Sequence, residues 1–366
     1  MTTKIPPELV ADQIFDGRRL TINGAMNISQ RGSVTGITTS SYGGPDRCRM
    51  VVANAGTYTL SQAAAAPSGS GFDKSLDVAC TSSDTYGTST DVNHLRLSHL
   101  EGQDCIKFAH GTSSAKKLTV QFWVKCSYAD TFGLALVNHH SQKSNIQKFT
   151  IASADTWQFI TLTYNGDTAA GFTNNNTLGL SLDLFLGGGS DYTGGSATLN
   201  NWDTRSNNQS TYLSSTSTKF GTSTSHTFNI TGLQLEVGDT ATPFEHRSTG
   251  EELALCQRYF YKEVRTSGSL FGFVGFADNS TTAYIQHIYP VSMRSEPTLS
   301  TTGTAGDYSI RVTGNTLGCS SVPSLSSGNE HVSHVTYSVS SGLTGGQAVV
   351  GKFDAADVFL GFDAEI

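Results

Sequence analysis

Two tryptophans, Trp123 and Trp157, stand in segments where apolar residues alternate with residues of other types. Because successive side chains of a β-strand point to opposite faces of the sheet, we expect both indole rings on the face opposite the apolar side chains. Aromatic rings on such a face can stack on the C–H surface of a sugar, and Gln121, Gln158 and Thr161 can form hydrogen bonds beside them. The alternative is that a loop or the other sheet covers this face, since large aromatic side chains are usually well buried.

Two further aromatic residues stand in stretches that the sequence predicts to be loops. Tyr192 lies in Ser190–Thr193 and Trp202 in Leu199–Asp203, both among Gly, Ser and Asn residues. Aromatic side chains in exposed loops are natural contact residues for a ligand or for another subunit. Local packing is the other interpretation, and the sequence does not separate the two.

A pair of carboxylates for glycosidic bond cleavage is not evident. Glu101 and Asp104 are the best nearby pair, but residues three apart on a strand point to opposite faces and cannot flank one bond. A turn or a calcium site is a better interpretation of these two acids. Because short motifs of nucleophilic hydrolases, zinc proteases and nucleotide-binding loops are also absent from the sequence, we expect a protein that is not an enzyme.

The histidines and cysteines do not have metal-site spacing. His139 is adjacent to His140, and Glu330 and His331 precede His334, but on strands these side chains diverge, whereas zinc ligands converge at about 2 Å. The 6 cysteines are far apart in sequence and form no CxxC pair, so we expect free, buried thiols. The histidine and cysteine spacing therefore predicts no metal site, and we expect no cofactor.

Composition favours a mostly β protein. Charged residues are 14% of the 366 residues, against about 25% in an average soluble domain, and Ser, Thr, Gly and Asn are abundant instead. These residues disfavour helix interiors. The net charge of −7, with Lys and Arg scattered, argues against nucleic acid as a partner. No apolar run approaches the ~20 residues of a membrane helix, and the first residues lack a signal-peptide pattern, so we expect no membrane insertion and synthesis in the cytosol.

The chain divides by pattern into four parts. Residues 1–26 contain Pro6-Pro7 and then a short amphipathic stretch, which predicts one helix that is too short to be stable unless it docks on something else. Residues 27–247 consist of short strands between Gly, Ser, Asn and Asp clusters, the pattern of a β-sandwich. The leucines of 178–186 repeat with period two, which predicts a half-buried strand.

The other two parts are a short helix and a second β domain. Ser248 and Glu251 fit a capping box, so 248–261 is predicted to be a helical linker, with the helix itself over about 250–261. Residues 262–366 return to strand patterns. We therefore predict an all-β chain in which a larger sandwich and a second, smaller one are joined by a short helix.

Two sets of segments resemble known families. The segments Ala115–Lys125 and Thr156–Tyr164 resemble the Phe-Trp-Val-Lys and Thr-Trp-Gln strands of carbohydrate-binding jelly rolls. A second set is similar to a junction common in structural proteins of tailed-bacteriophage virions: Ile230–Gly238, Ala241–Ser248 and Glu251–Tyr261, together with Asn27–Gly32 and Phe362–Ile366. The resemblance covers about 27–262 and is most specific at the junction.

The resemblance implies a jelly-roll component of a phage particle, a tail fibre or tail appendage that forms a homotrimer and can bind a glycan of the host surface. It implies a virion location after assembly in the host cytoplasm, with residues 1–26, including Leu9, Ile14 and Phe15, attaching the chain to other virion proteins. A capsid decoration, head-fibre or cement protein is the first alternative. A polysaccharide depolymerase is the second.

Overall fold

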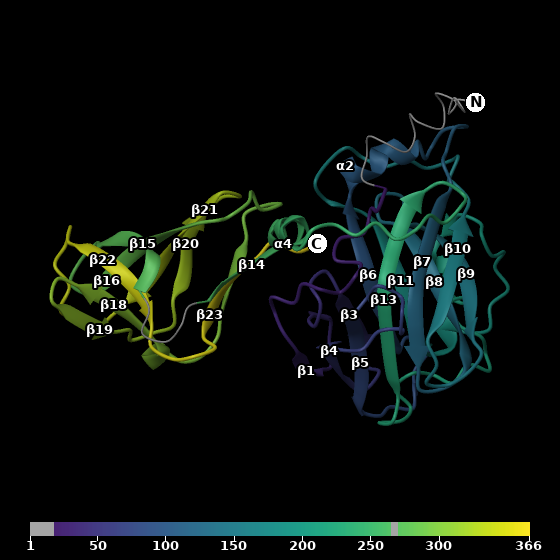
Figure 1. Cartoon of the computed structure of the whole chain (residues 1–366), viewed down its shortest axis with the longest axis horizontal. Coiled ribbons are helices and arrows are strands. Elements are labelled where there is room, and N and C mark those ends of the chain that lie inside the picture. Colours follow the sequence, from purple (N-terminus) through teal and green to yellow (C-terminus); the bar gives the residue numbers. More distant parts are fainter. Residues whose placement is uncertain (1–17, 265–269) are drawn as a thin grey trace. The chain divides into compact units, whose positions relative to one another are not determined.

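The computed structural model describes residues 18–264 and 270–366. Leu9, Ile14 and Phe15 lie outside these residues, as does the helix predicted after Pro6-Pro7. The chain divides into two compact units, Met1–Glu252 (unit 1) and Leu253–Ile366 (unit 2), each built of stacked β-sheets (Figure 1). The predicted all-β class, with a larger sandwich followed by a smaller one, is confirmed. No helix in the described part of the chain is long and apolar enough to cross a membrane.

Unit 1 is a sandwich of two antiparallel sheets. The six-stranded sheet has, in spatial order, the strands β1 (Val34–Ile37), β4 (Thr57–Ala63), β5 (Ser75–Ser82), β13 (Thr227–Val237), β7 (Leu118–Cys126) and β10 (Gln158–Tyr164). The seven-stranded sheet has the strands β12 (Asp203–Thr204), β9 (Lys143–Ile151), β8 (Asp130–Asn138), β11 (Leu178–Gly188), β6 (Val92–Glu101), β3 (Arg49–Ala53) and β2 (Ser41–Tyr42). The short helices α2 (Gly102–Cys105) and η1 (Ile106–Phe108) follow β6.

The core of unit 1 lies between the two sheets and follows the period of two in the sequence. Val120 and Phe122 of β7 are fully buried, as are Leu182 and Leu184 of β11. Alternation turns every second side chain of each strand inward, and each fully buried aliphatic or aromatic side chain contributes about 1.5–3 kcal/mol.

The prediction that 178–186 is a half-buried strand is wrong, because both faces of β11 are buried. Its outer face lies under residues 189–226 (the covering segment), which contain η2 (Ser190–Tyr192) and α3 (Arg205–Gln209). The Tyr212 ring stacks on Phe185 with centroids 3.8 Å apart. A Cβ atom at Gly133 of β8 would lie 2.0 Å from the Tyr212 carbonyl oxygen, so this backbone rests directly on the sheet.

The helix α4 (Thr249–Gln257) spans the boundary between the units. The predicted capping box is present: the Ser248 amide and hydroxyl donate to the Glu251 carboxylate over 3.0 and 2.9 Å, and the Glu251 amide donates to Ser248 Oγ over 3.3 Å. These hydrogen bonds lower the pKa of Glu251. The helix ends earlier than predicted, since the strand β14 begins at Phe260.

Unit 2 is a smaller sandwich. Its three-stranded sheet has the strands β14 (Phe260–Val264), β23 (Phe359–Asp363) and β17 (Thr298–Thr301). Its seven-stranded sheet has the strands β19 (Asn315–Gly318), β18 (Tyr308–Val312), β22 (Ala348–Phe353), β15 (Leu270–Ala277), β16 (Thr282–Ile288), β21 (Val332–Ser338) and β20 (Ser324–Gly328), and η3 (Ala305–Asp307) precedes β18. Ile285, Val335, Tyr337 and Phe362 are fully buried in its core.

Candidate functional site

Aromatic side chains gather on the outer face of the six-stranded sheet of unit 1. Trp123 of β7 pairs in register with Phe159 of β10, and their ring centroids are 5.2 Å apart at 52°. Trp123 is half-buried and Phe159 is 49% exposed. The alternation in the sequence therefore places both rings outside the sandwich core, on an accessible face.

Trp157 extends this group toward the start of β10. Its ring lies 5.4 Å from Nζ of Lys125, within reach of a cation–π interaction, and Lys125 is two residues from Trp123 on the same face of β7. Thr161, two residues beyond Phe159, is exposed on the same face of β10. Rings and a hydroxyl side chain thus share one accessible surface.

A glycine brings a third ring against Trp123. Gly232 lies at the β-bulge of β13 with φ +63°, in the left-handed region that favours glycine. A Cβ atom there would lie 2.7 Å from the Phe72 ring and 3.3 Å from Trp123 Cδ1. The Phe72 ring in turn meets Phe244 edge-to-face, with centroids 4.8 Å apart. We call Phe72, Trp123, Trp157, Phe159 and Phe244 the aromatic patch.

The segment that carries Phe244 is held in place by hydrogen bonds to β13. The Thr242 amide and hydroxyl donate to the Glu236 carboxylate over 2.9 and 2.6 Å. The Glu245 amide donates to Gln234 Oε1 over 2.8 Å. These hydrogen bonds hold the segment 242–245, and Phe244 with it, against β13 at one edge of the aromatic patch.

A buried ion pair anchors the same segment to the start of the described chain. The Arg19 guanidinium pairs with the Glu252 carboxylate, which also accepts the Asn23 amide over 2.6 Å. Arg19 also lies 4.9 Å from the Phe244 ring centroid. Burial lowers the pKa of Arg19, and the charge of Glu252 opposes that shift. A charge buried this deeply needs its partner. The Arg19 amide also donates to the carboxylate of Glu245 over 2.7 Å, which ties the residue after Phe244 to this anchor.

Three predicted site residues do not present their side chains to a ligand at this patch. Gln121 is only 4% exposed, and its Nε2 donates to the Thr242 carbonyl over 2.7 Å. The Gln158 side chain alternates to the other side of β10, beside Val124, and accepts the Ala152 amide over 3.1 Å. Trp202 packs against the unit 1 core and donates from Nε1 to the Asn165 carbonyl over 2.6 Å. Sequence spacing cannot reveal the distant partners of Gln121 and Trp202, whereas strand alternation by itself already turns Gln158 to the face opposite Phe159.

Tyr192 also serves packing, in the covering segment. Its ring stacks near Phe185 and Tyr212, at 6.3 and 6.5 Å between centroids. Of the predicted residues, the structure brings together Trp123 and Trp157 and places Tyr192 on the layer over the other sheet. Phe72 and Phe244 were not predicted as site residues, because Phe72 comes close to Trp123 only at the bulge of Gly232 and Phe244 joins the patch through Phe72.

The outer face of the seven-stranded sheet carries a buried charged cluster. Arg96 Nε and Nη2 donate to the Asp183 carboxylate over 2.9 and 3.2 Å, and His94 Nε2 lies 3.7 Å from it. Burial opposes ionisation of Asp183, but the charge of Arg96 keeps its pKa below the ordinary value. Burial lowers the pKa of both His94 and His139 to about 4. Arg96 donates one hydrogen bond to each carboxylate oxygen of Asp183. We therefore interpret this cluster as a structural ion pair beside neutral histidines.

The remaining candidate acids and histidines have local roles. Glu101 is fully buried and accepts Gln103 Nε2 over 2.7 Å, whereas Asp104 is exposed in α2, so the two carboxylates are not matched as a pair. His139 Nε2 bonds Ser181 over 2.8 Å, and His140 accepts the Thr173 amide over 2.9 Å. Across residues 18–264 and 270–366, no group of three His, Cys, Asp or Glu side chains is placed to hold a metal ion. The 6 cysteines are buried thiols rather than disulfides, as predicted.

No protein-family model and no curated protein matches the sequence. Among solved structures, the chain is similar to the enzymatically active domain of tailspike protein 4 from bacteriophage CBA120, at TM-score 0.32 and 11% identity over 60% of this chain. The chain spans 21% of that tailspike structure. It is also similar to a CBM4 structure, at TM-score 0.29 and 11% identity over 59% of this chain and 97% of the other. The tandem CBM22-1-CBM22-2 domains of Paenibacillus barcinonensis Xyn10C match at TM-score 0.24 and 11% identity, over 90% of this chain and 94% of theirs. TM-scores of this size establish neither a shared fold nor a shared function.

Proposed function

We propose that unit 1 binds saccharide chains through the aromatic patch, and that the protein is a non-enzymatic structural component of a tailed-phage particle. The observation that carries the binding proposal is the pair Trp123 and Phe159, side by side on an accessible sheet face. Two rings 5.2 Å apart make an apolar surface of the kind on which sugar C–H groups stack.

The surroundings of the patch offer hydrogen-bonding groups to a bound sugar. Thr161 offers an exposed hydroxyl beside Phe159, and Lys125 borders Trp157. The rings are already held by Gly232, Phe72 and the hydrogen bonds of residues 242–245, so little ordering is needed when a ligand binds.

The place in the particle rests on the sequence resemblance around 230–261. In a tail fibre or appendage, oligomerisation multiplies weak contacts, so a single site of low affinity is sufficient to hold a particle on a host surface glycan. Homotrimeric assembly and attachment through residues 1–26 are part of this proposal. Imaging of particles labelled with an antibody to this chain tests it: label at the tail supports it, and label across the head favours the capsid-decoration alternative.

The binding proposal is tested with a glycan array and affinity electrophoresis on the full chain. Trp123→Ala and Phe159→Ala remove stacking surface outside the core, so we expect each to weaken binding by about tenfold or more, which is about 1.4 kcal/mol. Ile106→Ala is the matched control, because Ile106 is an exposed apolar residue of unit 1 (45%) away from the patch.

Thermal melting separates loss of a contact from loss of the fold. Weaker binding with an unchanged melting temperature supports the proposal. Binding that is equal in wild type, Trp123→Ala and Phe159→Ala contradicts it. Incubation of the protein with the bound glycan tests the non-enzymatic part, because the appearance of new reducing ends would favour a depolymerase instead.

A further inference from the structure

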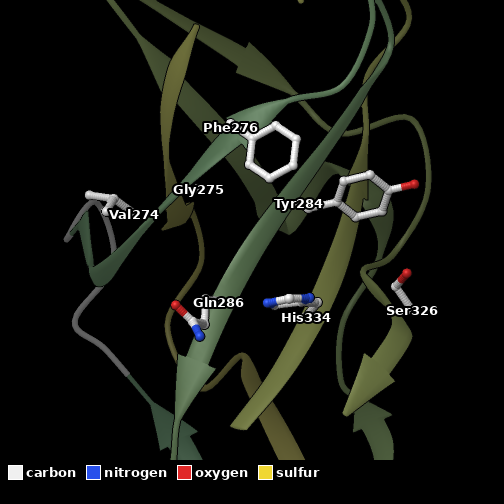
Figure 2. Close-up of a pocket in the computed structure, with 7 residues that line it drawn as sticks. All are labelled: Val274, Gly275, Phe276, Tyr284, Gln286, Ser326 and His334. Carbon is white, nitrogen blue, oxygen red and sulfur yellow. The ribbon is translucent and has the colours of Figure 1, made fainter. Parts of the chain in front are cut away.

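A hollow of about 260 Å³ opens on the outer face of the seven-stranded sheet of unit 2 (Figure 2). Figure 2 shows the rings of Phe276 and Tyr284 toward one end of it and the side chains of Gln286 and His334 toward the other, with Ser326 at the side. Four neighbouring strands, β15, β16, β21 and β20, contribute these residues. The hollow is therefore part of the sheet and does not depend on a loop.

Strand register explains why these side chains meet. Phe276 pairs with Tyr284 across β15 and β16, and Gln286 pairs with His334 across β16 and β21. Tyr284 and Gln286 are two residues apart and share a face, while Ile285 between them is fully buried in the core. The sandwich core thus fixes the positions of the residues that line the hollow.

The lining combines accessible aromatic surface with unused hydrogen-bonding groups. Phe276 is 52% exposed, and its ring centroid lies 5.9 Å from that of Tyr284 at an angle of 57°. The side chains of Gln286, His334 and Ser326 have no hydrogen-bond partner among the residues that the structure describes. No Asp, Glu, Lys or Arg is among the seven described residues that line the hollow.

We propose that this hollow is a binding site of its own, for one uncharged pyranose ring. Phe276 and Tyr284 pack against the C–H face of the sugar, and Gln286, His334 and Ser326 bond its hydroxyl groups. Small-molecule sites have this composition, mostly apolar walls with a few polar groups that fix orientation. At about 260 Å³ the hollow is slightly smaller than their usual range of roughly 300–1,000 Å³. A single ring suits that size better than a long chain.

The lining favours a sugar over a protein partner. The core of a protein interface is stabilised by apolar contacts that exclude water. Here three polar side chains face the hollow, and an apolar protein surface would remove their water without offering hydrogen bonds in return. A sugar satisfies them, because each hydroxyl both donates and accepts. The hollow belongs to unit 2 and the aromatic patch to unit 1, so each site can be tested with its own variants.

Saturation-transfer NMR on the full chain tests the proposal, with the methyl glycosides of glucose, galactose, mannose and N-acetylglucosamine as probes. All proteins carry Trp123→Ala and Phe159→Ala, so that the stacking pair of the aromatic patch is removed. We expect at least one glycoside to show transfer, and Phe276→Ala to reduce it by more than half. Ile288→Ala is the matched control, because Ile288 is 54% exposed on β16 and does not line the hollow.

The second variant tests the polar half of the site. Gln286→Ala leaves both rings in place, and we expect it to weaken binding of the same glycoside. Binding that Gln286→Ala does not change would indicate adsorption to an apolar surface and would overturn the proposal. Absence of transfer for every probe would also overturn it. So would a change of oligomeric state in Phe276→Ala without glycoside binding, which would identify the face as a contact between copies of the chain. Transfer that a Phe276→Ala variant of the wild type keeps, and that is lost when Trp123 and Phe159 are replaced, would leave only the function proposed for unit 1.

Discussion

Mild acid should destabilise unit 1 through its buried histidines. His94 stacks on Phe185 with centroids 4.8 Å apart, and burial lowers its pKa to about 4 from an ordinary value of 6.5. Asp183 opposes this shift only in part, because Arg96 already binds its carboxylate. His94 is therefore neutral in the folded protein at pH values where the unfolded chain has bound a proton.

The size of the effect follows from the difference between the two pKa values. Above pH 6.5 His94 is neutral in both states, and the stability is complete. As pH falls from 6.5 toward 4, the unfolded state gains a proton that the folded state does not, and each pH unit lowers the unfolding free energy by about 1.4 kcal/mol. We expect a loss of about 1.4 kcal/mol at roughly pH 5.5 and about 3 kcal/mol near pH 4. His139, with a pKa of about 4, adds a loss of the same sign.

Urea unfolding at a series of pH values measures this loss. All 3 tryptophans, Trp123, Trp157 and Trp202, lie in unit 1, so tryptophan fluorescence reports on that unit. His94→Gln should flatten the pH dependence, whereas the control His331→Gln, at a residue with a 65% exposed side chain in unit 2, should leave it unchanged. A wild-type unfolding free energy that is constant from pH 7 to pH 5, or a slope that His94→Gln does not reduce, would refute the reasoning.

Three further predictions concern stability and thiol access. Glu252→Ala leaves the buried Arg19 charge without its main partner and should lower the unfolding free energy of unit 1 by about 3–5 kcal/mol in urea titrations, while an effect below about 1 kcal/mol would mean that water replaces the carboxylate. Leu182→Ala opens a cavity between the sheets and should cost about 2–5 kcal/mol in the same assay. All 6 cysteines should resist a thiol reagent in the folded protein and react in urea, since each is buried and burial raises the pKa of Cys126 to about 11; rapid labelling of native protein would contradict this.

Composition together with the period-two pattern was sufficient to predict the class of the fold, and the pattern also gave the direction of key side chains. Alternation around Trp123 depends only on strand geometry, so the sequence correctly places this ring outside the core. The capping box at Ser248 and Glu251 is equally local and is present in the structure. Features fixed by neighbours within a few residues can be predicted from one sequence.

Features that depend on distant segments could not be predicted in this way. Gln121 donates its side-chain hydrogen bond to Thr242, more than a hundred residues later in the chain. Phe72 lies near Trp123 only because of the bulge at Gly232. The outer face of β11 is buried by Tyr212, although the composition of the stretch around Tyr212 predicts a polar loop. Hydroxyl-rich composition predicts exposure on average, but it does not show where such a stretch lies.

The covering segment also determines how unit 1 tolerates damage. It shields an apolar strip of sheet that includes Phe185, Val137 and Ile146, all at most 1% exposed. Proteolytic cleavage within residues 189–226, or a bulky side chain at Gly133 that lifts Tyr212, would uncover this strip beside β9, whose outer side pairs only with the two-residue strand β12 of the same segment. Exposed apolar sheet next to an open edge promotes aggregation, so nicked protein should precipitate even though the aromatic patch on the opposite sheet is intact.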